Sequence, residues 1–78
     1  METFLGTIMA FPFTYAPRGW HLCDGRTMLI REYSALYSLL GTQFGGDGQN
    51  YFKLPQLASP GTNLQYYIAM DGTYPSRN

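Results

Sequence analysis

The sequence predicts an α+β domain that is mainly antiparallel β and carries one short helix packed on the sheet. The first observation is a series of short β-prone runs separated by turns containing Gly, Pro or Asp-Gly, at residues 4–11, 20–23, 26–30 and 64–70. The second is that residues 31–40 hold the single run with apolar side chains at helical spacing. Because the chain has 78 residues without a linker or repeat, we expect one domain over residues 1–78.

The first strand is predicted over Phe4–Phe11, and Pro12 ends it because proline donates no backbone hydrogen bond. Alternation places apolar side chains on both faces of this strand. Such a strand is either buried between layers or paired with another subunit. In so short a chain the second arrangement carries weight.

A second strand is predicted to begin at Trp20, the one tryptophan, after a Pro-Arg-Gly turn. Asp24-Gly25 follows at once, and this pair is typical of a type I′ turn. The sequence therefore predicts a hairpin whose second arm is Arg26–Ile30.

One apolar stripe predicts the helix over Arg31–Leu40, with Gly41 as its C-terminal glycine. The Gly-rich stretch 41–49 has neither the Gly-Lys-Ser/Thr ending nor the following helix of a phosphate-binding loop. We predict instead a compact turn in which Asp47 accepts bonds from nearby backbone N–H groups.

The clearest alternating pattern predicts the last strand over Leu64–Met70, and Asp71-Gly72 forms the turn after it. The predicted core combines apolar residues of the strands and the helix. Its members are Trp20, Leu22, Leu36, Leu39, Leu40, Phe52, Leu54 and Ile68.

Composition argues against several function classes. The formal net charge is zero and 13% of the residues are charged, without a Lys/Arg cluster that could neutralise phosphates, so nucleic-acid binding is disfavoured. Aromatic residues make up 17% of the chain, including seven tyrosines. This content favours contact with protein or sugar, or equally a Tyr-rich β core.

Candidate catalytic groups are few. His21, Cys23 and Asp24 lie close in sequence and could suggest a Cys-His nucleophile pair, but an oxyanion site and an orienting group would also be needed. The acidic residues that precede glycine fit turn chemistry better than calcium binding. We therefore predict no enzyme activity, no catalytic residue, no metal site and no cofactor.

Several spaced segments match one known family in a single order. They are Phe4-Leu5-Gly6-Thr7-Ile8, Ala16-Pro17-Arg18-Gly19-Trp20, Leu22-Cys23-Asp24-Gly25, residues 33–42, Phe44-Gly45-Gly46-Asp47-Gly48, Phe52-Lys53-Leu54-Pro55 and residues 68–78. In them the chain resembles the phage tail collar domain, specifically the bacterial group called microcystin-dependent proteins. The resemblance covers nearly the whole chain and implies a tail-collar-like fold with a non-enzymatic assembly role.

The chain departs from this family after Leu54-Pro55. Family members usually continue into Asp-Leu-Arg-Gly-Arg and a long insertion, whereas this chain passes through residues 55–61 almost directly to Leu64. The resemblance places the receptor-facing and metal-binding parts of tail fibres in or after that insertion. It thus favours a structural self-assembling subunit of a phage-tail-like fibre or extracellular filament over a small adhesin-like module that binds a glycan or surface receptor.

A thin single-domain core and low surface charge both favour association of identical copies. The resemblance suggests a trimer, and an unclosed head-to-tail contact would give an open filament instead. The predicted contact joins the N-terminal segment Met1–Phe11 to the Leu64–Met70 strand or the Tyr74–Asn78 tail of a neighbour. Its residues are Phe4, Leu5, Ile8, Met9, Phe11, Tyr66, Tyr67 and Tyr74.

The N-terminus lacks the positive and apolar regions of a classical signal peptide, and no transmembrane span is expected. We expect an extracellular or tail-associated protein that is cytoplasmic before assembly or release.

Overall fold

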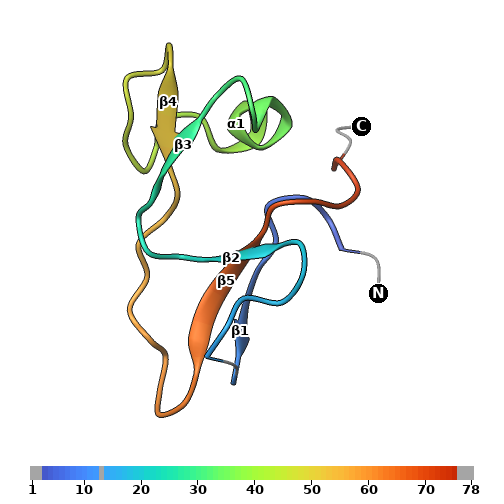
Figure 1. Ribbon diagram of the computed structural model, residues 1–78, viewed down its shortest axis with the longest axis vertical. Coiled ribbons are helices and arrows are strands. Elements are labelled where there is room, and N and C mark those ends of the chain that lie inside the picture. Colours follow the sequence, from blue (N-terminus) through green and yellow to red (C-terminus); the bar gives the residue numbers. More distant parts are fainter. Residues whose placement is uncertain (1–2, 13, 76–78) are drawn as a thin grey trace. The chain divides into compact units, whose positions relative to one another are not determined.

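The computed structural model describes residues 3–12 and 14–75, and its mainly antiparallel strands with one short helix confirm the α+β prediction. Two compact units divide the chain, one of residues 1–22 and 58–78, called unit 1, and one of residues 23–57, called unit 2. Figure 1 labels their elements. They are β1 (Ile8–Phe11), β2 (Trp20–Leu22), β3 (Thr27–Leu29), α1 (Ser34–Leu40), β4 (Tyr51–Lys53) and β5 (Gln65–Ala69).

Unit 1 contains a three-stranded sheet of order β1-β5-β2, and both pairings are antiparallel. The predicted last strand is therefore its central strand, labelled β5 in Figure 1. It is one residue shorter at each end than expected. Ile8 pairs with Ile68 on one side of β5, and Trp20 pairs with Ala69 on the other. Both edges of β5 are thus occupied within the chain.

The first strand begins later than predicted because the chain turns before it. Thr7 donates its backbone N–H to the Phe4 carbonyl at 3.1 Å, and Gly6 has φ 86°, the geometry of a turn with glycine at its third position. Gly6 and Thr7 together oppose Ala69, with Gly6 N–H donating to the Ala69 carbonyl and Ala69 N–H donating to the Thr7 carbonyl. This is a β-bulge with a left-handed glycine in first position, and it limits β1 to Ile8–Phe11.

Aromatic packing joins the three strands of unit 1 on one face. The Phe11 and Trp20 rings meet edge to face with centroids 5.1 Å apart, and the Phe11 and Tyr67 centroids are 5.9 Å apart. Tyr67, Ile68 and Ala69 are all at most 2% exposed, so burial in this sheet is concentrated on the central strand.

Unit 2 pairs β3 with β4 and adds α1, which begins three residues later than the sequence predicted. Gly41 ends the helix as expected, with φ 59° and its N–H donating to the Tyr37 carbonyl at 2.7 Å. Leu36, Phe52 and Leu54 are at most 1% exposed. The helix is short, so its stability depends on this packing.

The predicted hairpin at Asp24-Gly25 is wrong. β2 pairs with β5 and β3 pairs with β4, so the two predicted arms belong to different sheets. Gly25 has φ 78°, but Asp24 lacks the positive φ that a type I′ turn requires, and its backbone instead bridges to Gln56. Pairing with segments distant in sequence has overridden a local turn signal.

Candidate functional site

The outer edge of β1 is the first candidate surface. Because Ala69 N–H bonds to the Thr7 carbonyl, strand alternation directs the backbone groups of Met9 and Phe11 toward β5 as well. The N–H and C=O groups of Ile8 and Ala10 therefore point away from the sheet. Ile8 and Met9 are 39% and 38% exposed, and Ala10 is also exposed, so this edge is open and apolar.

The opposite edge of the sheet, along β2, has a different character. Met70 N–H donates to the Gly19 carbonyl at 2.7 Å, so alternation directs the backbone groups of Trp20 and Leu22 outward. Two of these groups have bonds within unit 1: Trp20 N–H donates to the Pro17 carbonyl at 3.0 Å, and His21 Nδ1 lies 2.9 Å from the Leu22 carbonyl oxygen. The β2 edge is therefore partly capped by its own chain.

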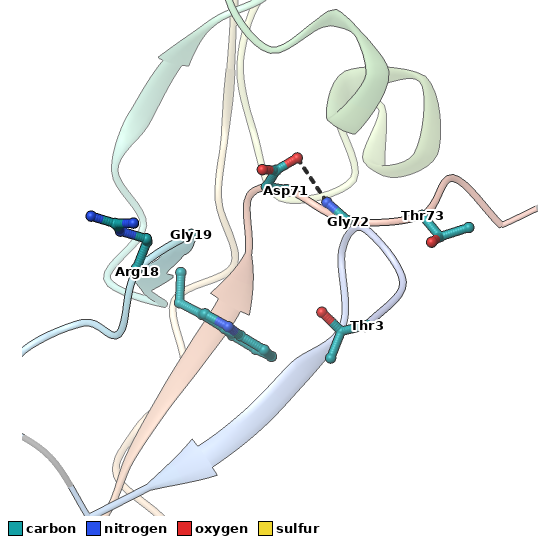
Figure 2. A pocket seen from close by; sticks show the side chains of 7 residues that line it. Thr3, Arg18, Gly19, Asp71, Gly72 and Thr73 are labelled. Carbon is teal, nitrogen blue, oxygen red and sulfur yellow. Dashed lines mark hydrogen bonds between the residues drawn. The ribbon is translucent and has the colours of Figure 1, made fainter. Parts of the chain in front are cut away.

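A hollow of about 500 Å³ in unit 1 is the second candidate site (Figure 2). Three segments that are distant in sequence form it, namely the N-terminal stretch, the turn before β2 and the stretch after β5. Its lining residues are Thr3, Arg18, Gly19, Trp20, Asp71, Gly72 and Thr73.

Backbone bonds hold the walls of this hollow. Thr73 N–H donates to the Thr3 carbonyl and Leu5 N–H to the Thr73 carbonyl, each at 2.9 Å. Figure 2 shows Arg18 on one side, Thr3 and Thr73 on the other, and Asp71 between them, with Asp71 Oδ1 accepting the Gly72 N–H at 2.9 Å. A guanidinium, a carboxylate and an indole thus border one open space.

The Cys-His pair weighed from the sequence has no support in the chemistry of Cys23. This side chain is 2% exposed, and burial, with a smaller effect of the neighbouring Asp24 charge, raises the pKa of its thiol to about 11. The thiol stays protonated at neutral pH, whereas a cysteine nucleophile reacts as the thiolate.

Asp47 confirms the prediction of a compact turn in the Gly-rich stretch. Its Oδ1 accepts backbone N–H bonds from Gln49 and Asn50 at 2.9 Å and from Tyr51 at 3.0 Å. These bonds hold the pKa of the carboxyl at about 2, below the ordinary 3.8, because they favour the charged form. Within the described residues, His, Cys, Asp and Glu side chains form no group of three suited to hold a metal ion.

The predicted interface residues differ in their exposure. Phe4 and Tyr74 are 58% and 49% exposed, Ile8 and Met9 are partly exposed, and Phe11 and Tyr66 are half-buried. Leu5 and Tyr67, at 8% and 2% exposure, are enclosed within the chain and present little surface to a neighbour.

The predicted core residues also differ. Leu36, Phe52, Leu54 and Ile68 are buried, whereas Trp20, Leu22, Leu39 and Leu40 are half-buried. Trp20 borders the hollow as well as packing on Phe11.

Sequence reasoning missed the hollow altogether. Its charged members, Arg18 and Asp71, come together because Met70 and Gly19 are hydrogen-bonded across β5 and β2. No short sequence pattern signals it, because the pairing of β2 with β5 brings the two Gly-containing turns together.

No helix among residues 3–12 and 14–75 has the length and apolar character needed to cross a membrane. A family model described as Phage Tail Collar Domain matches residues 6–60, which is more than half of the chain. No curated protein and no solved structure matches the chain.

Proposed function

The chain belongs to the phage tail collar domain family, a family of structural tail proteins, and we propose that it is a subunit whose copies self-associate within a phage-tail-like fibre. The family points to a structural role associated with the virion tail rather than to an enzyme activity. The proposal adds that assembly uses the chain's own N-terminal strand.

The observation that supports self-association is the open apolar edge of β1. Ile8 and Met9 expose side chains beside outward-pointing backbone groups, and residues 4–11 carry no charged side chain that would repel a second copy. A formal net charge of zero adds little long-range repulsion between copies.

Of the two segments predicted to pair with this strand in a neighbouring copy, one has no free strand edge. Both edges of β5 are occupied, so the Leu64–Met70 strand of a folded neighbour offers no edge for strand pairing. Ser76–Asn78 of the predicted tail partner, and Met1 and Glu2 of the predicted N-terminal segment, lie outside the described residues.

Light scattering on the purified chain, together with negative-stain microscopy, tests self-association. We expect the unsubstituted chain to form oligomers. Ile8→Lys should raise their dissociation constant by about tenfold or more, because a charge would enter the contact. Leu29→Lys is the matched control, since Leu29 is 37% exposed on β3 against 39% for Ile8. A monodisperse monomer at every concentration, or equal effects of both substitutions, would contradict the proposal.

The hollow in unit 1 supports a second candidate function, the binding of a neutral glycan. The Trp20 indole offers an apolar face for a sugar ring, and Arg18 and Asp71 offer a donor and an acceptor for hydroxyl groups. In this candidate function the sugar contacts Trp20, whereas the sequence had suggested contact through tyrosines.

A glycan array followed by Trp20 fluorescence titration tests this candidate. We expect Asp71→Asn to weaken binding of any sugar found by about tenfold, while Glu32→Gln, an exposed acid in unit 2, leaves it unchanged. An array without binding, or binding that Asp71→Asn leaves intact, would remove the glycan function.

A further inference from the structure

We propose that two copies of the chain join β1 to β1 as an antiparallel pair across a two-fold axis, with Met9 facing Met9 of the second copy. This inference rests on the proposed self-association and specifies which edge, which partner and which register carry it. It makes one continuous sheet from the two three-stranded sheets of unit 1.

The choice of β1 follows from the difference between the two sheet edges. On β2, the Trp20 N–H and the Leu22 carbonyl already have partners inside unit 1. On β1, the outward N–H and C=O groups of Ile8 and Ala10 have no such partner among the described residues. An incoming strand therefore gains more new hydrogen bonds at β1 than at β2.

The register follows from which groups point outward. Pairing Ile8 with Ala10 of the second copy, and Ala10 with Ile8, satisfies the N–H and C=O of both residues in both strands. Between these two pairs, Met9 of one copy lies opposite Met9 of the other. Such a pair lacks backbone hydrogen bonds and brings the facing side chains closest. A register centred on Ile8 would place Ala10 opposite Gly6 in the turn, and one centred on Ala10 would place Ile8 opposite Pro12.

The ends of β1 limit the length of the new ladder. The bulge at Gly6 turns the chain away at one end, and Pro12 removes a donor at the other. Because the two partners use the same surface, the contact closes on itself as a pair of copies. Growth into a fibre then requires a different surface.

Disulfide trapping tests the register. In the proposed pair, Met9→Cys places two thiols at facing positions whose Cα atoms lie about 4.5 Å apart, within disulfide range. Ile8→Cys is the matched control because Ile8 is 39% exposed against 38% for Met9, yet its two copies would be offset by two residues along the ladder. Under mild oxidation, we expect Met9→Cys dimers to form about tenfold faster than Ile8→Cys dimers.

The native thiol gives little background, since Cys23 is 2% exposed with a pKa of about 11. Faster trapping of Ile8→Cys than of Met9→Cys overturns the register. Equal and slow trapping of both variants, with the unsubstituted chain still oligomeric by light scattering, overturns the β1 pairing and leaves self-association standing. A chain that is monomeric throughout overturns both.

A second variant tests the edge without cysteine chemistry. Ala10→Pro removes an N–H that points away from β5, so the sheet of unit 1 keeps its internal bonds, and proline is tolerated at such edge positions. We expect Ala10→Pro to keep the circular dichroism of the folded chain and to lose dimers, whereas Ala10→Val keeps both. Folded dimers of Ala10→Pro would overturn the proposal.

Discussion

The two units differ in how far apart in sequence their paired strands lie. In unit 2, β3 and β4 belong to one continuous segment, residues 23–57, and the helix and glycine loop connect them directly. In unit 1, the central strand β5 pairs with two strands from the other end of the sequence, residues 1–22. Unit 1 therefore closes a long loop before its sheet can form, whereas unit 2 needs only its own segment.

The two units also differ in which elements supply their buried side chains. Unit 2 draws its buried side chains from a strand, a helix and the segment after β4, as Phe52, Leu36 and Leu54 show. In unit 1 the most buried residues, Ile68 and Ala69, lie on the central strand, and the edge strand β1 stays largely exposed. Unit 2 thus completes its core from one continuous segment, whereas unit 1 keeps an exposed edge at β1.

The largest expected effect comes from the core of unit 2. Phe52→Ala should lower the free energy of unfolding by about 3–5 kcal/mol, because a fully buried ring leaves a cavity. Phe44→Ala, at a 41% exposed ring, is the control with an expected cost below about 1 kcal/mol.

The same variant asks whether residues 1–78 behave as one domain. Trp20, the single tryptophan, lies in unit 1, so its fluorescence during urea unfolding reports a unit that does not contain Phe52. We expect the transition to shift to lower urea in Phe52→Ala. An unshifted fluorescence transition would show that the two units unfold independently.

A backbone substitution in unit 2 comes next in size. Gly46 has φ 113°, and an added Cβ would lie 2.5 Å from Phe52 Cα, so Gly46→Ala should cost about 2–3 kcal/mol. Gly61→Ala is the control, because nothing lies within 4 Å of a Cβ there. Urea midpoints of both variants measure the difference, and equal midpoints would contradict it.

In unit 1, the aromatic face should give a smaller effect. Phe11→Leu retains an apolar side chain but loses the edge-to-face contact with Trp20, for an expected cost of about 1 kcal/mol. Because Phe11 is half-buried, this cost should fall below that of Phe52→Ala. Thermal unfolding followed by circular dichroism measures both costs, and a larger cost for Phe11→Leu than for Phe52→Ala would contradict the difference in burial between the units.

The smallest effect concerns pH. Hydrogen bonds lower the pKa of Asp47 from 3.8 to about 2, so its contribution to stability is present above 3.8 and is lost as the pH falls toward 2. Asp47→Asn should flatten the acid side of the stability curve in this range, while Glu32→Gln should leave it unchanged. An NMR titration that gave Asp47 an ordinary pKa would contradict the account.

Local features were predictable from the sequence and non-local ones were not. The glycine at the end of α1 and the Asp47 turn depend on neighbouring residues, and both were predicted. The Asp24-Gly25 hairpin failed because its arms found partners elsewhere, which alternation alone cannot reveal. The strand from Phe4 was predicted too long because apolar alternation continues through the turn at Gly6.

The same limit applies to the candidate sites. Alternation identified Ile8 and Met9 as apolar strand residues, but which edge is open depends on the strand order. Leu5 and Tyr67 have the side chains of interface residues, and the fold encloses them instead. The hollow depends on three distant segments, so no short pattern signals it.

The protonated, enclosed thiol of Cys23 has a consequence for how the fold responds to oxidants. In oxidising surroundings, exposed thiolates form mixed disulfides or sulfenic acids. With a pKa of about 11 and 2% exposure, Cys23 presents almost no thiolate to either environment. The sulfur of Cys23 should therefore stay chemically unchanged in reducing and in oxidising surroundings alike.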